Sequence, residues 1–242
     1  MKNKHLLIAL SISAAASFSA TSQANDKPWH VGVSINQADL DSVDTISTAQ
    51  VGGVSRSINI DSDDDTGFGL VVGRTLFTSA NGHSIVAELS YASSEHDVEN
   101  LQFMGNDFFA SEGRSEGSVE VETVLARVAY KFDLGSVSPY IGIGIGQSDL
   151  EADVRYGGSV GQTPQVTPPF VIGGDSATAI EFRAGAEYQL SDQFGVFLEY
   201  STISVDDIEF SRTGGGPGGL ATTIQSGDYD IDSLNLGVKL HF

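Results

Sequence analysis

The stretch ATAIEFRAGAEYQL, residues 177–190, decides the fold of this chain. Its apolar side chains recur at every second position for more than ten residues. A period of two is typical of a β-strand whose faces meet different surroundings. One parity carries Ile180, Phe182, Ala184, Ala186, Tyr188 and Leu190, and the other carries Glu181, Arg183, Gly185, Glu187 and Gln189.

The same alternation recurs, so that the chain contains eight such segments. The last is residues 233–242, where Leu234, Leu236, Val238, Leu240 and Phe242 share one parity. No segment after the N-terminal stretch has the apolar length of a membrane-spanning helix. Each segment is about 10–14 residues long, which suits a tilted strand that crosses a bilayer. The other six lie near residues 29–38, 66–77, 83–92, 119–132, 139–148 and 194–204.

The connections between these segments alternate between short and long. Residues 78–82, 133–138 and 191–193 form short turns, and Asn81-Gly82 is a strong hairpin signal. The remaining connections, near 41–65, 93–117, 149–176 and 205–229, are each about 25 residues, which is unusual in a compact soluble domain. The pattern predicts an all-β fold: an eight-stranded antiparallel up-and-down transmembrane β-barrel with four long external loops and short periplasmic turns.

In a membrane barrel the apolar parity faces lipid. Aromatic residues at the strand ends predict two interfacial girdles. A soluble barrel with its apolar face inward is the alternative. In segment 66–77, Arg74 shares the parity of Phe68 and Leu70, so either a bulge reverses that face or Arg74 snorkels to the interface. The girdle residues are Trp29, Tyr188, Phe194 and Phe242 on the turn side, and Tyr91 and Tyr200 on the loop side.

The opposite parity then carries charge into the lumen. An eight-stranded barrel is just wide enough for side chains to fill it, and buried charges are tolerated when they are paired. We expect a network of ion pairs, with Glu88 opposite Arg127 and Arg183 beside Glu199. Inward Gly142, Gly144 and Gly146 would make room for the long side chains. The predicted network comprises Glu88, Arg127, Lys131, Glu181, Arg183, Glu187, Glu199 and Lys239.

The first 24 residues have the pattern of a cleaved signal peptide. Lys2 and Lys4 precede a short apolar run, and Ser22-Gln23-Ala24 offers a small-x-small cleavage site. We therefore expect an exported barrel domain over residues 25–242, in the outer membrane of a Gram-negative cell. The formal charge of −20 argues against nucleic acid as a partner, and the absence of cysteine excludes disulfides and thiolate chemistry.

Three features together resemble the OmpA-like family of small outer-membrane β-barrels. They are the signal peptide, the segment Pro139-Tyr140-Ile141-Gly142-Ile143-Gly144, and the terminal strand that ends in Leu240 and Phe242. The resemblance implies that the barrel assembly machinery reads Leu240 and Phe242 as a terminal signal. The chain ends at its last strand, so a periplasmic peptidoglycan-binding domain is not expected.

The predicted loops contain twenty acidic residues and four arginines. Such loops could remain solvated, or they could bind divalent cations that bridge to membrane lipid and lipopolysaccharide. The densest acidic site offers Asp61, Asp63 and Asp65 as a weak metal candidate, because the glycine and glutamate of a calcium loop are missing.

His96 is the one histidine expected on the external side, with Ser93, Ser94, Glu95 and Asp97 around it. We interpret it as a loop histidine and expect neither an enzyme nor a bound cofactor. The sequence favours a structural or surface-interaction role. A narrow porin-like channel and a lipid-modifying enzyme remain the alternatives.

Overall fold

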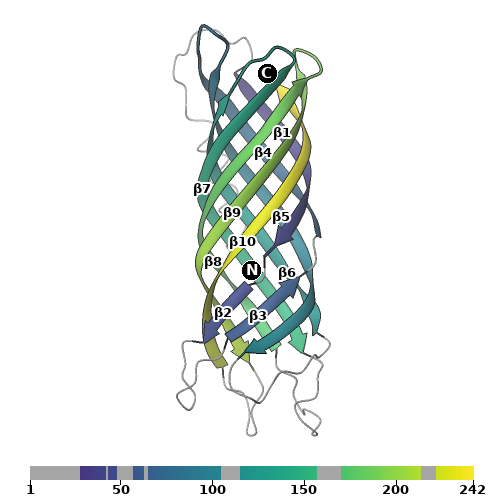
Figure 1. Ribbon diagram of the computed structural model, residues 1–242, viewed down its shortest axis with the longest axis vertical. Helices are drawn as coiled ribbons and strands as arrows, with labels where there is room; N and C mark the ends of the chain where they lie inside the picture. Colours follow the sequence, from purple (N-terminus) through teal and green to yellow (C-terminus); the bar gives the residue numbers. More distant parts are fainter. Residues whose placement is uncertain are drawn as a thin grey trace.

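The computed structural model describes residues 28–41, 43–47, 57–62, 65–104, 115–156, 170–213 and 222–242. These residues form a closed antiparallel barrel with eight strands around its wall, which confirms the predicted fold class (Figure 1). No helix in this part of the chain is long and apolar enough to cross a membrane. The predicted signal peptide, residues 1–24, lies outside the described residues.

β1 pairs with β4, each strand from β4 to β10 pairs with the next along the chain, and β1 pairs with β10 to close the ring. Beyond the ends of β1 and β4, the short strands β2 and β3 continue the wall between β10 and β5; they lie at the lower end of Figure 1. The strands are β1 (Trp29–Leu40), β2 (Val43–Ser47), β3 (Ser57–Ser62), β4 (Asp65–Thr78), β5 (Ser84–Met104), β6 (Ser115–Lys131), β7 (Val137–Tyr156), β8 (Phe170–Gln189), β9 (Phe194–Thr213) and β10 (Thr222–His241).

The three short turns lie at the same end of the barrel as the start of β1 and the end of β10. Gly82 and Gly135 have φ values of 83° and 90°, which glycine adopts without the steric cost that a Cβ would add. Trp29 and Phe242 exchange backbone hydrogen bonds of 3.1 and 2.9 Å, so the seam between first and last strands is closed to its final residue.

The strands are longer, and the connections shorter, than the sequence analysis predicted. β5 continues to Met104, β7 to Tyr156 and β9 to Thr213, so much of the expected loops is regular strand. The predicted length of about 25 residues was wrong for three of the four connections, whereas the segment between Leu40 of β1 and Asp65 of β4 keeps it and contains β2 and β3. The alternation of inward and outward residues continues past residues 93, 149 and 205. The apolar residues, however, face mainly outward before these positions and mainly inward after them.

β7 shows this change of parity clearly. Ile141, Ile143 and Ile145 point outward and are about 60% exposed, at 58%, 58% and 60%. Farther along the strand, Leu150 and Val154 point inward and are fully buried, while the residues between them are acidic or small. The barrel therefore has two parts: a membrane half, which is apolar outside, and an external half, which is acidic outside and apolar inside.

β4 keeps one outward face from Phe68 to Arg74. Phe68 and Leu70 face outward, and Arg74 lies on the same face with its guanidinium 5.3 Å from the centre of the Trp29 ring. The ladder irregularity lies beyond it, between Thr75 and Phe77. Arg74 thus reaches the interface beside an aromatic residue, as the snorkelling alternative predicted, and no bulge precedes it.

Candidate functional site in the barrel lumen

The eight residues of the predicted charge network all point into the membrane half of the lumen. Glu181 is 0% exposed and Arg183 is 5% exposed, so their charges are removed from bulk water. Lys131 and Arg127 are partly buried. Buried charges are stable only with close partners of opposite sign, and each of the eight has at least one.

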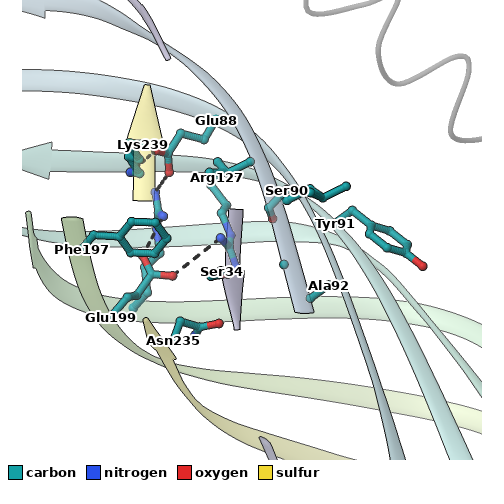
Figure 2. A pocket seen from close by; sticks show the side chains of 14 residues that line it. Ser34, Glu88, Ser90, Tyr91, Ala92, Arg127, Phe197, Glu199, Asn235 and Lys239 are labelled. Carbon is teal, nitrogen blue, oxygen red and sulfur yellow. Dashed lines mark hydrogen bonds and ion pairs between the residues drawn. The ribbon is translucent and has the colours of Figure 1, made fainter. Parts of the chain in front are cut away.

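Glu88 is the centre of the first cluster. Its Oε1 lies 2.9 Å from Nζ of Lys239 (Figure 2). Its Oε2 lies 2.5 Å from Nη2 of Arg183. Nε2 of His30 is also 2.7 Å from Oε1. One carboxylate therefore joins strands β1, β5, β8 and β10 across the lumen.

Glu199 and Glu181 form the second cluster, which shares Arg183 with the first. Nη1 of Arg183 lies 3.0 Å from Oε2 of Glu199, as the sequence analysis expected. Arg127 contacts Glu181 and, at 3.7 Å, Oε1 of Glu199. The Tyr140 hydroxyl donates a 2.9 Å hydrogen bond to Glu199.

Arg127 does not pair with Glu88, although the two residues are opposite each other in the β5–β6 ladder. Its side chain crosses Gly144 on β7 to reach Glu181 on β8, and these three residues lie in one register row. A Cβ at Gly144 would lie 2.7 Å from Oε2 of Glu181 and 3.2 Å from Cγ of Arg127. The missing side chain of Gly144 thus decides which carboxylate Arg127 meets.

A third cluster lies toward the turn end. Glu187 accepts hydrogen bonds from Nζ of Lys131 at 3.0 Å and contacts Nε2 of His241 at 2.7 Å. Sequence reasoning did not include His30, His241 and Tyr140 in the charge network. The alternation in the sequence does indicate that they face inward, because His241 lies between outward Leu240 and Phe242, and Tyr140 precedes outward Ile141.

Aromatic rings complete the charged layer. Nζ of Lys239 lies 5.0 Å from the centre of the Phe197 ring and 5.5 Å from that of Tyr140. Such contacts stabilise a cation that is removed from water. Two small cavities of about 20 and 30 Å³ flank the layer, and each is large enough for about one water molecule.

The external half of the lumen is filled by a hydrophobic core that the sequence analysis did not predict. Within it, burial raises the pKa of Tyr229 to about 12, so that its phenol stays neutral. The core consists of Ala38, Leu40, Val98, Val119, Val121, Leu125, Leu150, Ala152, Val154, Ala177, Ala179, Ile203, Val205, Ile208, Tyr229 and Ile231.

His96 belongs to this core and not to a loop, so its interpretation as a loop histidine was wrong. It lies on β5, is 0% exposed, and its Nε2 is 2.9 Å from the Ser94 hydroxyl. That distance suits a nucleophile and a base, but both side chains are buried in the lumen. Residue 96 points inward because β5 continues past residue 93 with the same inward parity as Glu88 and Ser94.

The acidic metal candidate falls mostly on side chains that are not described. Nothing is shown of the side chains of Asp61 and Asp63, whereas Asp65 accepts a 2.5 Å hydrogen bond from the Thr66 backbone. Across the described part of the chain, no group of three or more His, Asp or Glu residues could hold a metal ion.

The outer surface of the external half carries acidic residues in register. Glu95 on β5, Glu120 on β6 and Glu151 on β7 are consecutive partners in one row, and all three are exposed. Like charges directly opposite each other on neighbouring strands are unfavourable. Repulsion between these carboxylates therefore lowers the stability of the barrel, and exposure to solvent reduces this effect.

The two residues of the predicted assembly signal lie on the outer face of β10 and immediately after it. Leu240 and Phe242 are 37% and 55% exposed on the lipid-facing surface, next to the turn end.

Comparison with known proteins places this barrel in a family. The family model described as outer membrane protein beta-barrel domain matches residues 6–242. The chain therefore belongs to the outer membrane protein beta-barrel domain family, and its apolar belt is a lipid-facing surface of the outer membrane. No curated protein matches the chain by sequence.

Solved structures with the same fold have low sequence identity. The outer membrane protease OmpT from Escherichia coli has a TM-score of 0.57 at 9% identity, over 93% of this chain and 100% of OmpT. Neisserial surface protein A has a TM-score of 0.47 at 13% identity, over 88% and 97%. Ail, the attachment invasion locus protein of Yersinia pestis, has a TM-score of 0.46 at 13% identity, over 90% and 100%. At such identities the likeness supports the fold alone.

Proposed function

We propose that this protein is a closed, non-conducting outer-membrane barrel with a structural and surface-interaction role. The observation that carries the proposal is the double closure of the lumen. The membrane half is blocked by the ion pairs of Glu88, Arg183 and Lys239, and the external half is filled by the core around Leu125 and Leu150. An ion would have to displace both layers to cross.

Planar-bilayer recording tests this function directly. Purified barrel, refolded and checked by heat-modifiability on a gel, is added at graded amounts to a bilayer in 1 M salt, a condition chosen for the assay. We expect rare, small openings at most. Steady channels whose number follows the amount of folded protein would instead establish the narrow porin-like alternative.

The external half supplies the surface for interaction. Its outward rows are acidic, as in Glu95, Glu120 and Glu151, and they begin directly above the apolar belt. Carboxylates at this height can share divalent cations with the phosphates of lipopolysaccharide, since hard cations prefer oxygen ligands. Mg²⁺ should therefore strengthen binding of lipopolysaccharide to the barrel, and replacement of these three glutamates by glutamine should remove the Mg²⁺ dependence.

We propose no enzymatic activity and no cofactor. Among the described residues, the nearest candidate for a hydrolytic pair is Ser94 and His96, which are only 8% and 0% exposed in the lumen. Hydrolysis of lipid A by the wild type that disappears in His96→Ala would overturn this part of the proposal.

The proposal also includes export and assembly of the protein. Cleavage after Ala24 would release a mature protein that begins at Asn25, and the barrel assembly machinery would recognise Leu240 and Phe242. N-terminal sequencing of protein from isolated outer membranes tests the cleavage site.

A further inference from the structure

The lipid-facing belt of the barrel is not uniformly convex. A hollow with a volume of about 750 Å³ lies mainly over β1, β4, β5 and β10, with Val124 of β6 and Phe194 of β9 also in its lining, which is almost entirely apolar. Val72 lies at its centre, because it is the register partner of Val31 on β1 and of Leu89 on β5. The hollow is continuous with the belt that contacts lipid, so its occupant in the membrane is hydrocarbon.

The two ends of this hollow differ in charge. Toward the external end, Tyr91 donates a 2.7 Å hydrogen bond to Glu122, and Asp65 follows Phe68 toward the external end of β4. This end therefore repels phosphate. Toward the turn end, the next outward residues after Val31 and Val72 are Trp29 and Arg74, which are themselves register partners.

Arg74 is the one arginine or lysine on the outer face of the barrel among the residues whose side chains are described. Its guanidinium is held over the Trp29 ring at 5.3 Å. An arginine in a fixed orientation binds phosphate oxygens through two donors at once, and tryptophan favours the depth of lipid headgroups. Charge and position thus select a headgroup on the periplasmic side.

We infer that the hollow and Arg74 together form a binding site for one phospholipid of the inner leaflet. One acyl chain of the lipid lies in the hollow against Val72, and its anionic phosphate contacts Arg74 beside Trp29. The site is distinct from the lumen and from the acidic external surface, and it does not depend on the proposed function.

Titration with phosphatidylglycerol tests the site. The delipidated, folded barrel in neutral detergent is titrated, and native mass spectrometry counts the bound lipids. The protein has a single tryptophan, Trp29, so quenching of its emission by brominated acyl chains reports binding at this position. We expect one saturable lipid per barrel, together with saturable quenching.

Three variants separate the hollow from general lipid contact. Val72→Phe fills the hollow, and Arg74→Gln removes the phosphate partner; each should weaken binding at least about tenfold, which corresponds to about 1.4 kcal/mol. Leu198→Phe is the matched control, because Leu198 faces lipid on β9 outside the hollow, and it should bind like the wild type.

The inference fails if the wild type binds no lipid in a fixed ratio, or if Val72→Phe and Leu198→Phe bind equally. It also fails if purified lipid A competes for the same Val72-dependent site more strongly than phosphatidylglycerol, since that outcome assigns the hollow to the outer leaflet. Heat-modifiability confirms that each variant is folded before it is titrated.

Discussion

Arg127 faces Glu88 across the β5–β6 ladder but makes its ion pairs with Glu181 and Glu199 on β8 and β9. Glu88 in turn pairs with Arg183 and Lys239. These ion pairs of the charged layer therefore cross the lumen between strands that are not neighbours in the sheet. Arg183 connects the two halves of this layer, because it alone contacts both Glu88 and Glu199 among the ion pairs of the described residues.

Arg183→Ala should lower the free energy of unfolding by roughly 3–5 kcal/mol, because two buried carboxylates then lose a partner. Urea unfolding in detergent micelles or vesicles measures this loss. Arg74→Ala is the control, since Arg74 lies at the interface and should cost far less. Equal losses for the two variants would contradict the role of Arg183 in the layer.

Arg127→Ala should destabilise the barrel without creating a steady pore. The hydrophobic core of the external half stays in place above the altered charge layer, so ions still meet an apolar barrier. Planar-bilayer current from the variant, compared with the wild type at equal amounts of folded protein, gives the answer. A large increase in current would mean that the charge layer alone closes the lumen. Arg127→Ala with Glu181→Gln should recover part of the lost stability.

Gly144→Val should also destabilise the barrel, by about 1–3 kcal/mol, because the added side chain takes the space through which Arg127 reaches Glu181. Gly135 is a useful comparison, since a Cβ there would meet nothing within 4 Å, although its positive φ adds some strain to Gly135→Asn. The melting temperatures of the two variants should differ clearly, with Gly144→Val the lower.

Leu150→Ala tests whether the external half has a true core. A buried leucine that is replaced by alanine typically costs about 2–5 kcal/mol, whereas Ile143→Ala removes a side chain from the lipid-facing surface. We expect Leu150→Ala to be more sensitive to surface proteolysis on intact cells and to urea. If Ile143→Ala is the more damaging of the two, the external half is not a packed core.

Deletion of Phe242 should reduce the amount of folded protein in the outer membrane. Phe242 is exposed on the lipid face, so the folded barrel loses little side-chain packing, although it loses the two backbone hydrogen bonds to Trp29. We expect the larger effect on recognition during assembly. The heat-modifiable fraction in cells measures the effect. Normal refolding of the same variant in detergent would distinguish an assembly defect from instability.

The sequence by itself determined the number of strands around the wall, the turn end, and the outward face of the membrane half. These properties follow from the period of two, because successive side chains on a strand must point to opposite faces. Residues 177–190 therefore place Ile180 outside and Glu181 inside without any knowledge of the neighbouring strands. The alternation of Gly142 and Gly144 with isoleucine likewise predicts that these glycines face inward.

Only the tertiary structure decided how the two halves differ and which charges meet. The sequence analysis assumed that the same face of a strand stays apolar along its whole length. In the structure, the apolar residues move from the outer to the inner face where a strand leaves the membrane. The predicted β5 and β7 therefore ended too early, and His96 was assigned to a loop. The partners of Arg127 depend on the shear of the barrel and on the space at Gly144, which bring β6, β7 and β8 into one row. Such contacts join residues more than fifty positions apart, and no local pattern encodes them.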